Sequence, residues 1–542
     1  MSKKLIKSGL IVSVMTLISR VLGLVRDVVI ANVMGAGVMA DVFLFANKIP
    51  NFFRRLFAEG AFAQAFVPVL SEYHTKDEKN AEEKAKANND IGVEHDVYLD
   101  ETRRLIAQVS GTLGVIITLV TLFGMLASPL FVILFGGGWF VDWFTNGPDS
   151  VGGEKFELAA SLLKITFPYL WFISFTALAG AVLNTMGRFA VAAFTPVLLN
   201  IAIILMAVYG GEYTESPAYT LAWGVFFGGL IQFLFQLPFL YKAGVLVKPC
   251  WSWHSKGVTK IRKLIVPALF GVSVTQINLL LDTLIASFLI TGSISWLYYA
   301  DRLLEFPLGL FGIGIATVIL PSLAKLHSKN SPTEFTATLD WGIKVISLFG
   351  WPALAGLMVL AQPIIMILFM RGEFSQDTVL QVSYALFAYL SGLLSFMFIK
   401  VLAPGYYARQ DTKTPVKIGI IAMVSNMAFN LMLAPFFGYV GLAVATTMSA
   451  TLNAWLLYRG LKGAGVYHLS KSTKFFIGKL VLSAVVMALV VYQLSSDFDV
   501  WLAMSFTEQV LQLFMCIGGG CLSYFIMIAL LGIRLADFKV KN

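Results

Sequence analysis

Charged residues are scarce in this sequence. Asp, Glu, Lys and Arg make up 13% of its 542 residues, whereas hydrophobic residues make up 58%. Soluble domains carry about 25% charged residues, so a water-soluble globular protein is excluded. Apolar runs longer than the ~20 residues that cross a hydrocarbon core recur along the chain between short polar or Gly/Pro breaks, which favours helices over barrel strands. We therefore predict an all-α polytopic membrane protein.

Reactive and metal-binding groups are also few. The three cysteines, Cys250, Cys516 and Cys521, have no metal-ligand spacing and give no disulfide framework. The five histidines lie in predicted loops and form no cluster. The sequence has neither a G-x-x-x-x-G-K-[ST] phosphate loop nor an H-E-x-x-H zinc motif. Primary pumping and hydrolysis are therefore unsupported, and we predict a transporter, not an enzyme, with no bound cofactor.

Fourteen apolar segments lie between the polar breaks, and each is long enough to be a membrane-spanning helix. The first has the basic start and apolar run of a signal peptide. No small-residue cleavage site follows it, and Arg20 interrupts the run, so we interpret it as a retained span. The predicted helices cover residues 8–34, 38–70, 104–135, 156–186, 191–210, 217–242, 260–290, 294–325, 338–370, 379–408, 414–436, 438–460, 474–494 and 505–533.

The loops between these helices differ in positive charge. When the loops are assigned alternately to two sides, Lys and Arg gather on one side and the other has only Lys155 and Arg371. Positively charged loops stay in the cytoplasm, which places both chain ends there. The net charge of +9 then mostly reflects topology, and a nucleic-acid surface is the weaker interpretation. The long hydrophilic segment 71–104 falls on the cytoplasmic side, where we expect a solvated or partly helical loop; a partner-binding role is the alternative.

The two halves of the sequence resemble each other weakly at a constant offset. LFANK, beginning at Leu44, and YYADR, beginning at Tyr298, stand 254 residues apart; PVLSE at Pro68 and PSLAK at Pro321 stand 253 apart. This predicts a duplication in which helices one to six correspond to helices seven to twelve. Parallel repeats of this kind are a transporter architecture with the binding site between the halves, near the membrane midplane.

The repeat leads to a prediction of domains around a central cavity. We expect an N-lobe at 1–243, a C-lobe at 244–460 and an added pair of C-terminal helices at 461–542.

Charged side chains recur on single faces of the predicted helices. An ionised group at the bilayer centre costs about 2.5–3.5 kcal/mol on insertion scales, so such faces must meet a wet cavity or one another. A spacing of seven residues turns only about 20° around a helix, and spacings of three or four also share a face. The faces comprise Ser13, Arg20 and Asp27; Asp41, Lys48 and Arg55, followed by Glu59; Thr275, Asn278 and Asp282; and Ser295, Tyr298, Arg302 and Glu305 beside Asp301.

Six cations lie on or beside these faces: Arg20, Arg26, Lys48, Arg54, Arg55 and Arg302. Local neutralisation, of Arg55 by Glu59 or of Arg302 by Glu305 or Asp301, is the structural alternative for each acidic residue. The five guanidinium groups among them predict an anion with planar, multidentate oxygens, which means phosphate or carboxylate.

Several long motifs occur together and in order. They closely resemble the lipid II flippase family, called MurJ and formerly MviN, of the multidrug/oligosaccharidyl-lipid/polysaccharide exporter superfamily. The similarity runs from the first predicted span to the twelfth, and fourteen spans is the family's number. The motifs are SRVLGLVRD (19–27), IPNFFRRLFAEGAFAQAFVPVLSEY (49–73), LLKITFPY (162–169), YYADRLLEFPLG (298–309) and VLAPGYYARQDTKTPVKI (401–418).

The resemblance implies a transporter of the bacterial cytoplasmic (inner) membrane. Its substrate would be lipid II, an undecaprenyl-pyrophosphoryl disaccharide-pentapeptide, moved from the inner to the outer leaflet. Membrane lipids and the peptidoglycan-synthesis machinery would be its other partners, with no role for nucleic acid. The resemblance also implies functional roles for the arginines Arg20, Arg26, Arg54, Arg55 and Arg302 and for the acidic residues Asp41 and Glu305.

Helices thirteen and fourteen would form a groove for the polyprenyl tail, in the family's manner. Apolar residues there suit that role and suit ordinary lipid contact equally well: Trp501, Phe506, Leu511, Phe514 and Phe525. The charged insertion near residues 76–100 is longer than we expect of the family, which leaves open a contact particular to this chain.

Together these arguments predict a lipid II flippase that works by alternating access. Membrane potential, sodium and protons are the alternative driving forces. The rival functions are export of another polyprenyl-pyrophosphate-linked oligosaccharide such as an O-antigen unit, export of cationic drugs, which a positive cavity disfavours, and a non-transporting cell-wall scaffold. The predicted substrate-binding residues are Arg20, Arg26, Asp41, Lys48, Arg54, Arg55, Glu59, Ser295, Asp301, Arg302 and Glu305.

Overall fold

The computed structural model describes residues 3–56, 61–88, 99–534 and 537. Every regular element within these residues is helical, as predicted. The chain divides into two compact units, Met1–Phe288 and Leu289–Asn542. This division groups residues by packing, whereas the predicted boundaries at 243/244 and 460/461 group them by sequence repeat, so those boundaries stay a prediction.

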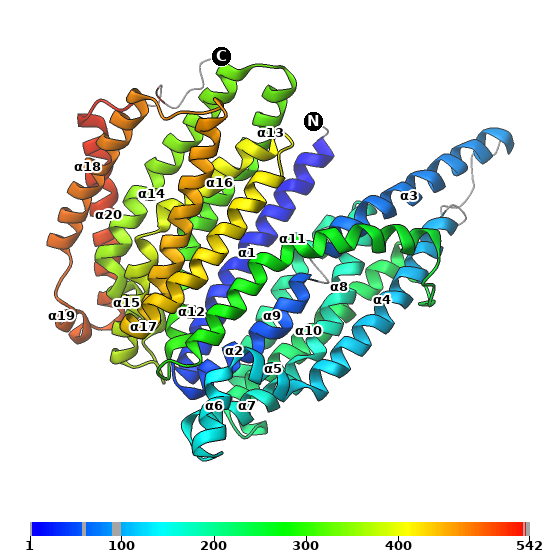
Figure 1. The fold of residues 1–542 in the computed structure, drawn as a ribbon, viewed down its shortest axis with the longest axis horizontal. Helices are drawn as coiled ribbons and strands as arrows, with labels where there is room; N and C mark the ends of the chain where they lie inside the picture. The colour runs from blue at the N-terminus through cyan, green and yellow to red at the C-terminus, as the bar shows by residue number, and fades with distance from the viewer. Residues whose placement is uncertain (1–2, 57–60, 89–98, 535–536, 538–542) are drawn as a thin grey trace. The chain divides into compact units, whose positions relative to one another are not determined.

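The first unit is built from eleven described α-helices and one short 3-10 turn (Figure 1). They are α1 (Lys3–Met34), α2 (Val38–Arg54), α3 (Ala61–Asn88), α4 (Asp100–Leu126), α5 (Ser128–Phe135), α6 (Gly137–Asn146), α7 (Val151–Thr166), α8 (Pro168–Thr185), α9 (Phe189–Tyr209), η3 (Gly211–Tyr213), α10 (Pro217–Lys242) and α11 (Lys256–Ala286).

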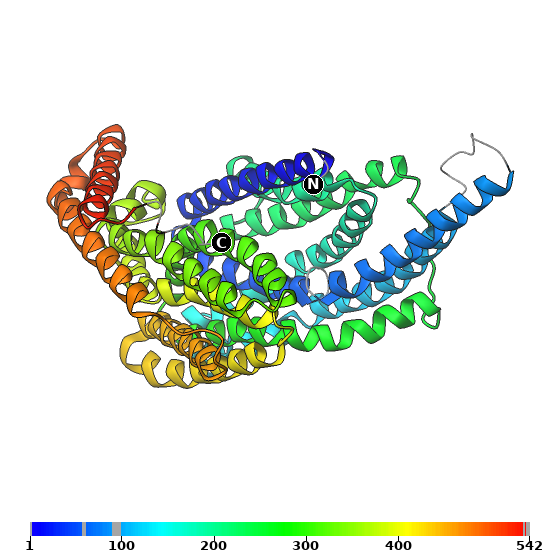
Figure 2. The ribbon, with the colours of Figure 1, turned by 90° about the horizontal axis from the view of Figure 1, so that it is seen from above.

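The second unit contains nine described α-helices and one π-helix. They are α12 (Ser293–Pro307), the π-helix η4 (Leu308–Ile313), α13 (Gly314–Ser328), α14 (Pro332–Phe369), α15 (Gln376–Leu390), α16 (Leu393–Tyr407), α17 (Lys413–Gly463), α18 (Lys471–Leu494), α19 (Phe498–Ala503) and α20 (Phe506–Leu530). In Figure 2, α18 and α20 lie side by side at the red end of the chain.

Ten of the described helical segments are long and apolar enough to cross a membrane, or eleven if the bent pair α5–α6 forms one span. The chain is therefore a multi-pass membrane protein. α5 and α6 meet at an angle of 102° around Gly136. α17 covers two predicted spans and is interrupted at Gly438, whose φ of 55° is a conformation that glycine adopts without steric cost.

The second helix of each predicted repeat ends in a wide π-helical turn. Arg55 and Leu56 have π geometry directly after α2, and η4 follows α12 from Leu308. These turns begin 253 residues apart, which matches the offset of the sequence repeat. π turns are rare and frequently mark functional sites.

α3 corrects the predicted end of the second span. The apolar pattern ends at residue 70, but the helix continues through the charged segment to Asn88 and extends away from its neighbours (Figure 1). The predicted partly helical loop is thus helical over residues 71–88, while 89–98 lie outside the described residues. Ala, Glu and Lys dominate this segment and are strong helix formers.

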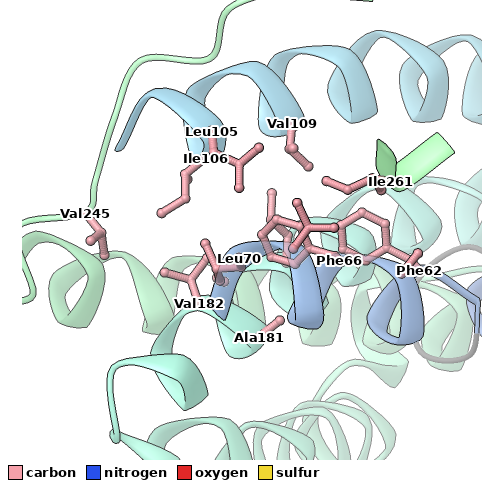
Figure 3. Close-up of a cluster of buried hydrophobic side chains, with 14 of the residues drawn as sticks. Phe62, Phe66, Leu70, Leu105, Ile106, Val109, Ala181, Val182, Val245 and Ile261 are labelled. Carbon is pink, nitrogen blue, oxygen red and sulfur yellow. The ribbon is translucent and has the colours of Figure 1, made fainter. Parts of the chain in front are cut away.

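The base of α3 is held by an apolar cluster. Phe62, Phe66 and Leu70 on α3 pack against Leu105 of α4 and Ile261 of α11, with further side chains from α8 (Figure 3). The side chain of Asp77 is buried and accepts hydrogen bonds from the backbone N–H groups of the first turn of α4, at 2.8 Å from Thr102. A carboxylate at this position accepts hydrogen bonds from the free N–H groups and interacts favourably with the positive end of the helix dipole. It therefore fixes where α4 begins.

Candidate functional site

The two arginines of α1 have different environments. Arg20 is exposed and makes no hydrogen bond or ion pair with the described part of the chain. Arg26 is half-buried: its Nε and Nη2 lie 3.0 and 2.7 Å from Asp27 Oδ1, and its Nη1 donates to Asn200 Oδ1 of α9 at 3.1 Å. The Asn200 amide also donates to the Ser19 carbonyl. Arg26 is therefore part of the α1–α9 packing, whereas Arg20 is available to a ligand.

The predicted face of α2 meets α11. Lys48 Nζ donates to Thr283 Oγ1 at 3.1 Å, and Arg55 Nη1 donates to Gln276 Oε1 at 3.2 Å. Both of these acceptors are neutral side chains of α11. Arg54 is half-buried and is oriented by Asn51, whose Oδ1 accepts from Arg54 Nε at 2.9 Å. Arg54 and Arg55 thus contact different partners, as expected for neighbours about 100° apart on a helix.

Asp41 lies at the opposite end of α2 from Arg55 and is buried. Its Oδ2 is 3.2 Å from Nζ of Lys155 on α7, and the two side chains are 2% and 4% exposed. Lys155 also faces the ring of Trp139 on α6, with its Nζ 5.5 Å from the ring centroid. The structure therefore places this carboxylate inside the packing of α2, α6 and α7.

In the second unit, Arg302 is held by its own helix. Its Nη1 lies 2.9 Å from Glu305 Oε2 and its Nη2 donates to the Tyr298 hydroxyl at 3.2 Å. The guanidinium also covers the Tyr298 ring at 4.9 Å. The local Arg302–Glu305 pair that the sequence offered as an alternative is present. The pair is partly exposed, with Arg302 at 35% and Glu305 at 53%.

The other predicted residues are placed as follows. Ser295 is buried in the first turn of α12, and Asp301 is exposed on the same helix. Asp282 is half-buried on α11. Glu59 lies outside the described residues, as do the side chains of Ser13 and Thr275. The described residues contain no group of three or more His, Cys, Asp and Glu side chains that could hold a metal ion.

Four partner residues were missed from the sequence: Lys155, Asn200, Gln276 and Thr283. Gln276 and Thr283 are seven residues apart and share one face of α11, next to the face predicted through Asn278 and Asp282. The sequence could have singled out Lys155, because it is one of only two cations in the loops assigned to the side opposite the cytoplasm. The other, Arg371, stacks on Phe506 at 4.1 Å, so both exceptions have contacts that hold them.

The chain matches known families over nearly its whole length. A family profile described as lipid II flippase MurJ matches residues 30–512. The chain belongs to the lipid II flippase MurJ family. Relatives in this family include the probable lipid II flippase MurJ of Vibrio cholerae, which is 61% identical over 100% of this chain and 99% of its own length. The lipid II flippase MurJ of Burkholderia cenocepacia is 38% identical over 99% of each chain.

Solved structures agree with the MurJ assignment. A lipid II flippase MurJ in an inward closed conformation aligns with a TM-score of 0.75 at 27% identity, covering 96% of this chain and 98% of that one. An inward-facing multidrug resistance MATE family transporter of the MOP superfamily aligns with a TM-score of 0.62 at 14% identity, over 83% and 95% of the two chains. The second likeness shows a shared fold only.

Proposed function

We propose that this protein is a lipid II flippase of the bacterial inner membrane. It moves the undecaprenyl-pyrophosphate-linked peptidoglycan precursor from the inner to the outer leaflet by alternating access. Family membership over residues 30–512, with relatives named for this activity, carries the proposal. The described cations support it, because Lys48 and Arg55 lie on one face of α2 and both donate to side chains of α11.

Pyrophosphate recognition is assigned to Arg20, Lys48, Arg54, Arg55 and Arg302. Arginine presents several N–H donors in a planar fork that matches phosphate oxygens, and bidentate contacts of this kind are strong. Arg20 has no partner among the described residues, and Arg302 is held by contacts that leave it partly exposed. Ser295, Asp301 and Glu305 lie on the same helix as Arg302 and are assigned to the sugar and peptide part of the substrate, whose hydroxyl and amide groups they can bind.

Fourteen spans in two six-helix lobes around a central cavity, with two added helices and both ends in the cytoplasm, are part of the proposal. Each predicted span overlaps a described helix, and α17 breaks at Gly438, between the eleventh and twelfth predicted spans. The π turns after α2 and α12 at matching positions of the two repeats also support the duplication.

The helix pair α18–α20 is assigned to the polyprenyl tail. Leu511, Phe514 and Phe525 on α20 are exposed apolar side chains that suit contact with a lipid chain. Trp501 is fully buried, and its Nε1 donates to Ser495, so it does not belong to this surface.

Membrane potential is the simplest driving force. Moving negative charge outward across an inside-negative membrane releases about 2.3 kcal/mol per charge per 100 mV. A doubly charged pyrophosphate therefore gains enough free energy for outward transport without an added ion. If dissipating the potential at constant pH and sodium leaves turnover unchanged, coupling to sodium or protons replaces this part of the proposal.

Complementation tests the function directly. A conditional lipid II flippase deletion is complemented with the parent chain, with Arg20→Ala, Arg55→Ala and Arg302→Ala, and with Arg459→Ala as a matched control on an exposed arginine outside the predicted faces. Membrane levels and the accessibility of lipid II in the outer leaflet are measured for each. We expect rescue by the parent and the control, and loss of outward exposure in the three other variants at normal membrane levels.

Two results would contradict the proposal. A parent chain that inserts normally and fails to expose lipid II shifts the substrate to another anionic lipid-linked oligosaccharide, such as an O-antigen unit. Full rescue by all three variants would make these arginines structural.

A further inference from the structure

An ion pair is buried at the Asp41 end of α2. Asp41 lies in the first turn of α2, and Lys155 lies near the start of α7, which begins after the capping residue Ser150. The exposed fractions of 2% and 4% leave neither side chain accessible to a ligand the size of lipid II. Among the described residues, Asp41 is the only charged partner of Lys155. The two charges therefore neutralise each other inside the protein.

Aromatic rings enclose this pair. Trp139 of α6 covers the Lys155 ammonium, and its ring centroid is 4.9 Å from that of Phe45 on α2. We call Asp41, Trp139 and Lys155 the buried ion-pair cluster. It joins three helices at one point, because each of its residues belongs to a different helix.

Two further contacts extend this junction. Thr166, at the end of α7, donates to the Ala46 carbonyl of α2, so α7 contacts α2 at a second point along the helix. The backbone N–H of Gly138 donates to Ser287 Oγ at 2.9 Å, directly after α11. A Cβ at Gly138 would lie 2.3 Å from the Ser287 carbonyl oxygen, so α6 approaches α11 as closely as glycine allows. Through α6, the cluster thus also sets the place of α11 relative to α2.

The same two helices orient the cations assigned to pyrophosphate. Lys48 and Arg55 follow Asp41 at intervals of seven residues, and their acceptors Thr283 and Gln276 lie on α11. A rotation of α2 about its axis would move both cations away from these acceptors. The cluster is therefore placed to control the direction of Lys48 and Arg55 without touching what they bind.

From this geometry we infer that Asp41 and Lys155 are positioning residues of the flippase. They form a buried neutral unit that fixes the rotation of α2 against α6 and α7, and Asp41 makes no contact with lipid II. The readout of this inference rests on the proposed function, while the pairing itself does not.

Variants that neutralise one residue of the pair, or both, distinguish a positioning role from direct contact with the substrate. Removing one partner of a buried ion pair leaves an uncompensated charge and is strongly destabilising, whereas replacing both partners by neutral groups of similar volume is often tolerated. The variants are Asp41→Asn, Lys155→Met and the double variant Asp41→Asn/Lys155→Met. Met keeps the length of the side chain and packs well on an aromatic ring. Glu154→Gln, an exposed carboxylate beside Lys155, is the matched control.

Purified protein is assayed for lipid II binding per molecule, for flipping in vesicles and for its thermal midpoint. We expect each single variant to lower binding and flipping by about tenfold or more, since small displacements of a binding group have effects of this size. The double variant should return to within about threefold of the parent in all three measurements, because no buried charge is left unpaired. The control should match the parent.

Two patterns would overturn the inference. If Asp41→Asn and the double variant fail equally while Lys155→Met retains activity, Asp41 touches the substrate or a coupling ion. If the single variants change only the thermal midpoint and leave binding per molecule intact, the cluster is structural and positions nothing. If the parent itself neither binds nor flips lipid II, the proposed function fails instead. The pairing is then tested by the thermal midpoint alone. Recovery of the midpoint in the double variant supports the pairing, and no recovery contradicts it.

Discussion

The charged face of α2 in the first unit and that of α12 in the second are held in different ways. On α2, the partners of Lys48, Arg55 and Asp41 belong to other helices, α11 and α7. On α12, Arg302 is held by Tyr298 and Glu305, which lie within one turn of it on the same helix. The face of α2 therefore depends on tertiary packing, whereas Arg302 has support from within its own helix.

Burial differs in the same direction. The side chains of Asp27 and Asp41 in the first unit are 3% and 2% exposed, while Glu305 in the second is 53% exposed. A buried charge that loses its partner stays out of water, whereas an exposed one is solvated. Substitutions that unpair the buried charges of the first unit should thus change stability and transport together, and those at the exposed pair on α12 should change transport alone.

The largest effect is expected for Arg26→Ala. It removes three hydrogen bonds, two of them to the buried Asp27 carboxylate, and we expect a loss of about 3 kcal/mol in stability together with loss of flipping. Arg302→Ala should abolish flipping with a thermal midpoint close to that of the parent. Thermal unfolding in detergent and flipping in vesicles measure both variants, with Arg26→Ala/Asp27→Asn as the control that regains stability. Equal destabilisation by Arg26→Ala and Arg302→Ala would break the comparison.

A smaller effect is expected when a neutral acceptor on α11 is removed. Thr283→Val keeps the shape of the side chain but removes the hydroxyl oxygen that accepts a hydrogen bond from Lys48. Hydrogen bonds to charged groups contribute about 1.5–3 kcal/mol, so lipid II binding should weaken by about tenfold. Titration of purified protein with lipid II measures this change. Thr283→Ser keeps the hydroxyl and should bind like the parent; equal weakening by Ser and Val would exclude the hydrogen bond as the cause.

The faces of α2 and α12 could be predicted from sequence because helical periodicity fixes which residues of one helix share a side. Asp41, Lys48 and Arg55 all face helices packed on α2, as a seven-residue spacing requires. Periodicity carries no information on which neighbour meets that side. The sequence predicted a face of α11 through Thr275, Asn278 and Asp282 and named no partners for α2. The structure shows that Gln276 and Thr283, beside that face, accept from Arg55 and Lys48.

The positions of two helix ends explain further differences between the sequence-based prediction and the structure. Lys155 was assigned to a loop because the apolar run was read from residue 156, but the helix begins at Val151 after Ser150, whose hydroxyl accepts from the Gly153 N–H. The cation is thereby carried inside the helix and into contact with Asp41. α3 shows the opposite case, since its apolar pattern stops at residue 70 while helix-forming residues and the Glu72–Lys76 pair continue the helix.

Tyr298→Phe should have a smaller effect than Thr283→Val. The change removes the hydroxyl that accepts from Arg302 Nη2 but keeps the ring under the guanidinium, and Glu305 still pairs with it. Loss of one of three local contacts should lower flipping by about threefold. Tyr298→Leu removes the ring as well and should lower flipping further. If Phe and Leu behave alike, the ring does not hold Arg302, and the local support on α12 reduces to the pair with Glu305.

The smallest effect is expected at Glu72, where a contact crosses helices but is exposed. Hydrogen bonds from Lys260 of α11 and from Lys76 hold the pKa of the Glu72 carboxyl below its usual value of 4.5. A lowered pKa stabilises the folded chain at pH above 4.5, and this contribution disappears as the pH falls below the pKa of the folded state. The thermal midpoint of Glu72→Gln should therefore lie slightly below that of the parent at neutral pH and converge with it in acid.

Thermal unfolding of both proteins from pH 7 to acid measures this difference, with Glu78→Gln, an exposed carboxylate farther along α3, as the control. Exposed ion pairs contribute little because water and salt screen them. A small difference that vanishes in acid would show that burial, and not the crossing from one helix to another, gives the contacts of the first unit their strength. A drop as large as that of Arg26→Ala would mean that any contact between helices there is essential, and a difference unchanged in acid would mean that the ionised carboxylate is not its cause.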